Sequence, residues 1–322
     1  MFKQTLETSA TPHITVTECL GDLEVRGSEQ QRVAIRLRDG AEELALEREG
    51  ESLTLTARDD CTLICPAGSS LTIHTVRGDL RVRGVRGPVV VGTVFGDTLL
   101  RGVGPAELGR IYGDLLARGA VGDLQAQMVA GDARVRQVMG QLRLEQVGSD
   151  LKAEGLEGGL VAEQVGADVW LWPPFAPGAT YRLGVGNNLV VHLPADVGLR
   201  LALRIGGRVH SLFPDLALEE VEGEVRGSLG AGEALLEARV GRDVYLSPLV
   251  VKEGPEEIAF DLAPDLEGLG VVIEARVAEA MAEMEARLAE SLGRIDDEAI
   301  RRRVERATEK ARQAAERAAE RA

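Results

Sequence analysis

The chain has 322 residues, with 52 acidic and 37 basic side chains and a formal net charge of -15 at pH 7. This charge disfavours nonspecific binding of the whole protein to nucleic acid or to an anionic membrane. The sequence contains no apolar run of about eighteen residues, and the segment 1–7 lacks the apolar stretch of a secretion signal. We therefore expect a cytoplasmic protein with no membrane insertion and no specific nucleic-acid ligand.

Residues 1–70 contain short segments in which apolar and polar residues alternate, as is typical of strands with one buried face. These segments have no fixed repeat length. An open end of a stack of strands would expose unpaired backbone groups and apolar surface. We therefore predict that residues 1–70 form an N-terminal β cap.

Glycines recur about every nine residues from Gly78 to Gly166, and many are followed directly by aspartate. Two apolar residues separated by one polar residue follow each turn, as in the segment 80–82. Turns this frequent leave no room for crossover helices. We predict an all-β fold, a parallel β-solenoid with about 18 residues per coil in two nine-residue halves, whose regular part is residues 71–172.

If two nine-residue units form one coil, alternate units stack on the same sheet. In the units that share one sheet, the outward position five residues after the glycine is arginine four times in a row and then glutamate. These arginines, called the arginine column below, are Arg83, Arg101, Arg118 and Arg136. Like charges on neighbouring strands repel, so the column predicts a counter-charge. The candidates are a polyanion or an acidic protein, including the acidic face of the first C-terminal helix. The other interpretation is a solvated surface without a dedicated ligand.

Alternation becomes less regular after residue 172, and we predict a less regular β continuation over residues 173–251. Trp170 and Trp172 point the same way from one strand. With Phe175 and Tyr181 they either form a contact site for sugar or protein, or plug the solenoid where its repeat breaks.

Apolar residues recur at helical spacing over residues 266–322, which predicts C-terminal helices with a break near 293–297. The second helix has a heptad stripe, formed by Val304, Ala307, Ala311, Ala314 and Ala318. We interpret this stripe as an oligomerisation helix that supports self-association. The alternatives are a helix folded back on its own solenoid and a frayed, solvated tail.

The sequence has no G-x-S-x-G or P-loop pattern, and we expect no enzyme activity and no cofactor. Cys19, Cys61 and Cys65 are predicted to be reduced core residues, because a C-x-x-x-C spacing in a strand lacks the turn of a structural zinc site. Each glycine–aspartate turn offers one carboxylate followed by an apolar residue, unlike calcium-binding nonapeptides. We therefore predict no metal site.

The segment 65–85 joins an x-Pro-x-Gly turn to the glycine–aspartate strand pattern. In this it resembles the bacterial putative-adhesin domain, a family of β-strand repeats of unknown function, over about residues 10–250. Cys65 replaces the usual aliphatic residue before Pro66. The resemblance implies a solenoid without established catalytic residues. Bactofilins, cytoplasmic polymers with coils of similar length, are a more distant likeness.

These patterns together predict a noncatalytic structural or scaffold protein, a rigid β-solenoid whose helical tail self-associates or docks a partner. An adhesin or carbohydrate-binding module is the alternative. A polysaccharide lyase or hydrolase fits least, because the outward positions are mainly arginine and glutamine where such an enzyme needs clustered carboxylates.

Overall fold

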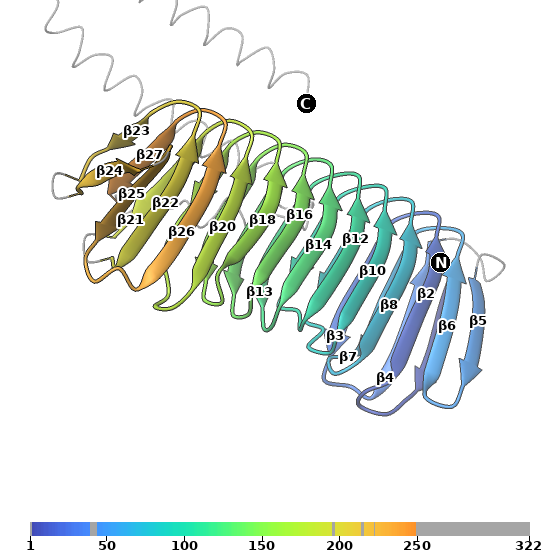
Figure 1. The fold of residues 1–322 in the computed structure, drawn as a ribbon. Coiled ribbons are helices and arrows are strands. Elements are labelled where there is room, and N and C mark those ends of the chain that lie inside the picture. The colour runs from blue at the N-terminus through green and yellow to red at the C-terminus, as the bar shows by residue number, and fades with distance from the viewer. Residues whose placement is uncertain (1, 39–43, 195–196, 214–215, 222, 249–322) are drawn as a thin grey trace, which may run out of the picture. The chain divides into compact units, whose positions relative to one another are not determined.

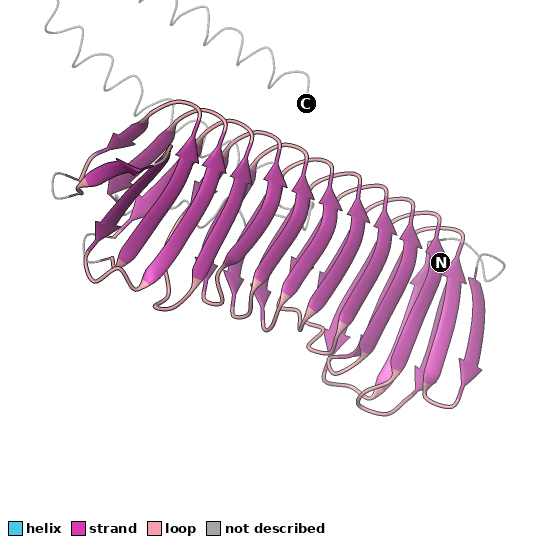
Figure 2. Ribbon diagram, in the orientation of Figure 1, coloured by secondary structure: helices cyan, strands magenta, loops and turns pink. Residues whose placement is uncertain are grey.

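The computed structural model describes residues 2–38, 44–194, 197–213, 216–221 and 223–248. The chain divides into two units, Met1–Val250 and Val251–Ala322, and the second lies outside the described residues. The predicted C-terminal helices at 266–322 therefore lie outside them too. Within the described part of the chain every regular element is a strand (Figure 2). No described helix has the length and apolar content needed to cross a membrane.

The strands form two large sheets that face each other (Figure 1). Sheet A has 13 strands, in the order β1-β4-β7-β3-β9-β11-β13-β15-β17-β19-β21-β27-β23. Sheet B has 14, in the order β24-β25-β22-β26-β20-β18-β16-β14-β12-β10-β8-β2-β6-β5. The strand bounds are β1 Phe2–Glu7, β2 His13–Cys19, β3 Leu23–Ser28, β4 Arg32–Leu37, β5 Leu44–Glu49, β6 Ser52–Ala57, β7 Cys61–Pro66, β8 Ser70–Val76, β9 Leu80–Arg83, β10 Val89–Val94, β11 Thr98–Arg101, β12 Ala106–Ile111, β13 Leu115–Ala120, β14 Leu124–Val129, β15 Ala133–Val138, β16 Leu142–Val147, β17 Leu151–Leu156, β18 Leu160–Val165, β19 Val169–Leu171, β20 Thr180–Val185, β21 Leu189–Leu193, β22 Leu199–Ile205, β23 Val209–Ser211, β24 Leu218–Val221, β25 Glu224–Leu229, β26 Ala234–Val240 and β27 Val244–Pro248.

Successive strands from β8 to β21 alternate between the two sheets, and neighbours within each sheet are parallel. We call one strand of each sheet, with its turns, a coil. Leu124 pairs with Leu142 in sheet B and Ala133 pairs with Leu151 in sheet A, so equivalent residues recur about every 18 residues. The prediction of an all-β fold with parallel strands is confirmed.

The core lies between the sheets and consists of aliphatic side chains from the inward positions. In β15, Ala133 and Val135 are buried, as the two-residue period of a strand requires. Val138 is also buried, although it is three residues further on. Gln137, with a φ of 57°, and Gly119, with a φ of 74° in the neighbouring coil, explain this break in the alternation. A left-handed residue at this position turns the following side chain back into the core.

Spatial order departs from sequence order at both ends of the stack. Strands β6 and β7 lie outside β2 and β3, and β26 and β27 lie inside β22 and β23. Antiparallel strands then close three of the four sheet edges: β1 and β4 in sheet A, and β5 and the β24–β25 pair in sheet B. These edge strands are short, and β5 and β24 expose charged side chains, which opposes edge-to-edge association.

Val138→Asp is expected to lower the free energy of unfolding by roughly 3 kcal/mol or more, because it places an unpaired carboxylate at a side chain that is 1% exposed. The measurement is the midpoint of urea unfolding. The control is Met139→Asp, since the adjacent Met139 is 58% exposed and tolerates a charge. Equal effects of the two substitutions would overturn the inward register.

Candidate functional site

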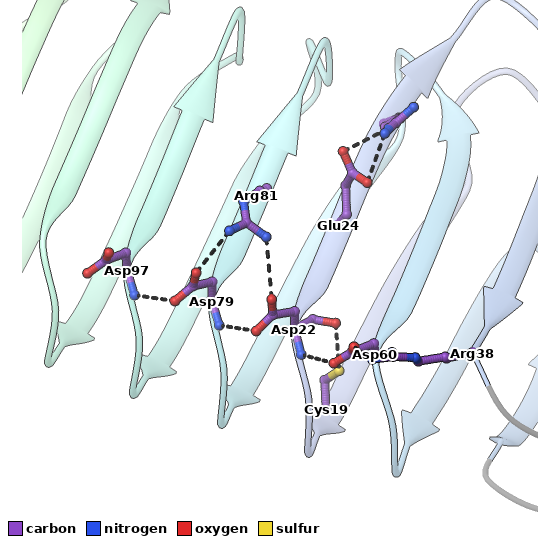
Figure 3. A network of polar contacts seen from close by, with 9 residues as sticks. Cys19, Asp22, Glu24, Arg38, Asp60, Asp79, Arg81 and Asp97 are labelled. Carbon is purple, nitrogen blue, oxygen red and sulfur yellow. Dashed lines mark hydrogen bonds and ion pairs between the residues drawn. The ribbon is translucent and has the colours of Figure 1, made fainter. Parts of the chain in front are cut away.

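A continuous ladder of aspartates runs along the beginning of the sheet A strands (Figure 3). The Oδ1 atom of Asp79 accepts a hydrogen bond from the backbone N–H of Asp97 at 2.9 Å, and Asp79 donates in the same way to Asp22. The aspartate ladder comprises, in spatial order, Asp60, Asp22, Asp79, Asp97, Asp114, Asp132, Asp150 and Asp168. Asn188 and Asp243 continue it through equivalent bonds. Each side chain thus satisfies one turn N–H of the next coil.

The same contact explains the glycine that precedes five of these aspartates, namely Asp22, Asp79, Asp97, Asp114 and Asp132. A Cβ atom at Gly131 would lie 2.1 Å from Oδ1 of Asp114, which no side chain can do without moving the turn. Where the preceding residue is Ser149, Ala167 or Arg242, the ladder bonds are 3.1 to 3.2 Å, against 2.8 to 2.9 Å at Asp97, Asp114 and Asp132. The bond at Asn188, which follows Asn187, is 2.8 Å, so this turn accommodates a side chain. The Gly-Asp pair is therefore a unit in which one residue makes room for the carboxylate of the previous coil.

The carboxylates of this ladder are used within the fold. Arg81 bridges Asp22 and Asp79, with distances of 3.4 and 2.9 Å, and Arg134 pairs with Asp132 at 3.0 Å. Among the described residues, no group of three or more His, Cys, Asp or Glu side chains could hold a metal ion. We assign the ladder a structural role.

The arginine column lies on the outer face of sheet A, with its members at directly paired positions. Arg83 pairs with Arg101, Arg101 with Arg118, and Arg118 with Arg136. The column also includes Arg26, which pairs with Arg83 and which sequence reasoning did not find. Neighbouring strands lie about 4.8 Å apart, so five like charges stand in one row.

Ion pairs lie at both ends of this row. Arg136 forms an ion pair with Glu154 at 2.7 Å, and Arg26 pairs with Glu24 of its own strand at 2.8 Å. Nε of Arg83 is buried and has no hydrogen-bond acceptor among the described residues. Beside the row, Leu99 and Leu116 are half-buried outward residues. The middle of the row thus combines positive charge with apolar surface.

The outer face of sheet A becomes aromatic beyond Glu154. Lys152 lies over the ring of Trp170 at 4.9 Å from the centroid, and Trp172 stacks on His192 with centroids 5.2 Å apart. Nδ1 of His192 is 3.1 Å from the Ser247 hydroxyl, and partial burial lowers the pKa of this histidine. Both tryptophans are half-buried.

Further along the same face, Tyr245 stacks on His210 with ring centroids 4.9 Å apart. Trp170 and Val190 are paired neighbours, as are Val190 and Tyr245. His192, Tyr245 and His210 therefore extend the aromatic surface that the sequence indicated only at the tryptophans. These three side chains lie near one another because β27 pairs with β21 and β23 pairs with β27. This strand order has no local sequence signal.

Phe175 and Tyr181 do not join the tryptophans. They contact each other edge-to-face in the core, with centroids 5.1 Å apart, and are 8% and 1% exposed. The Tyr181 hydroxyl donates to the carbonyl of Leu156 at 3.1 Å, and burial raises its pKa. These two rings fill the core where the chain departs from its regular repeat, while Trp170 and Trp172 remain on the surface.

The three cysteines are buried and free. Burial raises the pKa of Cys19 and of Cys65 to about 11 and that of Cys61 to about 12. All three are therefore neutral thiols at physiological pH and poor nucleophiles or metal ligands. The predicted oligomerisation helix, Val304, Ala307, Ala311, Ala314 and Ala318, lies outside the described residues.

No family model and no curated protein matches this chain. Solved structures similar to it include a putative cell adhesion protein from Clostridium sporogenes, with 11% identity, a TM-score of 0.16 and coverage of 77% of this chain and 99% of that one. Two others are a putative lipid binding protein from Parabacteroides distasonis (10% identity, TM-score 0.30) and a putative adhesin from Bacteroides fragilis (8% identity, TM-score 0.25). Each covers 77% of this chain and 96% of the other. At these TM-scores nothing about the function of this chain follows from them.

Asp114→Ala is expected to lower the free energy of unfolding by about 1–2 kcal/mol, because the N–H of Asp132 loses its acceptor. Asp114→Asn keeps an Oδ1 acceptor, as Asn188 does naturally, and is expected to change stability by less than about 0.5 kcal/mol. Urea midpoints of the two variants test this comparison. A loss for Asn as large as that for Ala would show that the charge, and not the hydrogen bond, holds the turn.

Proposed function

We propose that this chain is a noncatalytic β-solenoid scaffold of the putative-adhesin strand-repeat type, with a cytoplasmic location. Its outer sheet A face docks an elongated anionic partner, an acidic protein segment or a polyanion, along the arginine column. The observation that supports this function is the direct pairing of Arg83, Arg101, Arg118 and Arg136 on adjacent strands. The likeness to bactofilins stays a prediction.

The physical case for an anionic partner is the unfavourable energy of the row itself. Two unit charges 4 Å apart repel by about 1 kcal/mol in water and about 4 kcal/mol at an effective dielectric constant near 20. Arg83 faces arginine on both sides, between Arg26 and Arg101, and its buried Nε has no hydrogen-bond acceptor among the described residues. An extended partner with repeated negative charges relieves the repulsion along the whole row. Guanidinium groups also bind carboxylate, sulfate or phosphate in a bidentate manner.

A nucleic acid fits this surface less well. The outward residues beside the middle of the column include Leu99 and Leu116, and no aromatic ring alternates with these arginines to stack on bases. An enzyme that cleaves polysaccharides fits least, since it needs carboxylates or metal ligands clustered across adjacent coils.

A carbohydrate-binding module or adhesin is the second candidate, favoured by the half-exposed rings of Trp170 and Trp172. Rings on a strand surface offer flat apolar faces with hydrogen-bonding groups at their edges. Binding of neutral glycans that is lost in Trp172→Ala and retained in the arginine variants would favour this candidate over the scaffold.

Arg101→Glu combined with Arg118→Glu is expected to abolish retention of the full chain on an immobilised polyanion such as heparin at low salt. The reason is that it replaces two adjacent positive charges in the row with negative ones. The control is Arg110→Glu combined with Arg200→Glu, which makes the same charge change at exposed positions of sheet B. If both double variants elute alike, the column is not the binding surface.

Self-association through residues 266–322 is a separate part of the proposal, supported by the heptad stripe of the second predicted helix. We expect light scattering coupled to size exclusion to show a defined oligomer for the full chain. A chain ending at Pro264 is expected to be monomeric and folded. If both proteins contain the same number of chains per particle, the assembly role of the tail is contradicted.

A further inference from the structure

A groove lies on the outer face of sheet B, on the opposite side of the core from the arginine column. It has a volume of about 520 Å³ and crosses strands β16, β18, β20, β26 and β22, with β25 at its end. Its charged lining residues are Arg143, Glu163, Arg182, Arg204, Glu237 and Arg239, with Glu224 at the end. This volume is within the range of small-molecule binding sites, about 300–1,000 Å³.

A local irregularity in strand pairing lies within the groove. The register between β18 and β20 shifts between Ala162 and Val165, where an extra residue of β18 forms a bulge. Gly184 lies beside this bulge, and a Cβ atom there would be 2.2 Å from the carbonyl oxygen of Glu163. Only glycine fits this position, so the centre of the sheet surface has no side chain. The neighbouring lining residues Val161 and Ala202 are small and keep the floor low.

Positive charge in the groove exceeds what its glutamates neutralise. Arg182 pairs with Glu237 at 2.9 Å, and Arg143 forms an ion pair with Glu163. Glu224 is shared, lying 3.1 Å from Arg226 and 3.7 Å from Arg204.

Arg239 is exposed and makes no ion pair within the described part of the chain. It is the direct cross-strand partner of Arg204, and on its other side its partner is Gly184. Two like charges therefore face each other beside an open position.

We propose that this groove binds a small hydroxylated anion, a sugar that bears a carboxylate or a phosphate group. Arg239 and Arg204 hold the anionic group from adjacent strands, in the space that Gly184 leaves open. The carboxylates of Glu237 and Glu163 accept hydrogen bonds from the hydroxyl groups, and Val161 and Ala202 contact the apolar face of the ring.

Two properties of the groove distinguish this ligand from others. The alternation of arginine and glutamate provides both an anion site and acceptors, whereas inorganic phosphate alone would use only the arginines. The proposed anion site is also short, since Arg239 and Arg204 are direct partners on two adjacent strands, whereas the arginine column of sheet A crosses five strands. A monosaccharide or disaccharide matches this length, and a long polyanion does not.

Isothermal titration calorimetry of the full chain at low salt tests the proposal with four probes: glucose 6-phosphate, glucuronate, glucose and inorganic phosphate. We expect binding of at least one of the two sugar anions and no binding of glucose. The difference in affinity between glucose 6-phosphate and glucuronate shows whether phosphate or carboxylate is preferred. Inorganic phosphate should bind more weakly than the preferred sugar anion. Arg239→Ala should weaken that binding about tenfold or more, since it removes a charge-assisted contact.

Arg110→Ala, at an exposed position of β12 outside the groove, is the control and should retain the affinity of the original chain. Glu237→Gln should weaken the sugar anion more than inorganic phosphate, because it alters only the hydroxyl contacts and its own ion pair. Unchanged thermal melting of each variant shows that the fold is intact. Absence of binding for both sugar anions, or equal affinities of the original chain and Arg239→Ala, would overturn the proposal. Neither result bears on the sheet A site, which uses other residues.

Discussion

Each turn aspartate accepts a hydrogen bond from a backbone N–H of the next coil, and the rest of this structure depends on this constraint. The bond joins Asp79 to Asp97 and Asp97 to Asp114, and equivalent bonds run from β7 to β23 of sheet A. A slip of one residue between coils would turn every inward side chain outward. Because the bond ties the same turn atom of each coil to its neighbour, the register is specified at every step of the ladder.

This constraint explains what could be predicted from the sequence. The glycine spacing and the two-residue alternation were enough to predict parallel strands and the inward positions of Val129, Val138 and Val147, which are all buried. They also predicted that Arg83 and Arg101 are neighbours, since a fixed repeat places equivalent residues side by side. The carboxylate's actual partner, an N–H in the next coil, could not be read from one turn, because it lies about 18 residues away.

The neighbours of a strand could not be predicted where the order of the strands in the sheet differs from their order in the chain. Arg26 joins the arginine column because β3 lies directly beside β9, although residues 29–79 separate them in the chain. Tyr245 reaches the aromatic surface, and Arg239 meets Arg204, because β26 and β27 insert between earlier coils and the pair β22 and β23. No local period encodes such an insertion.

The two faces of the molecule show how one repeat supports different recognition chemistry. On sheet A the repeat is unbroken from β9 to β17, so a residue type that recurs forms a row, and we propose that an extended ligand docks along it. On sheet B, Gly184 of β20 lies beside the bulge of β18 and has no outward side chain, so this part of the surface is hollow, and we propose that a compact ligand binds there. In both cases the inward residues are the same aliphatic types, held in place by the turns. The outward residues contribute little to that core, and they can therefore be exchanged to test binding while the fold is retained.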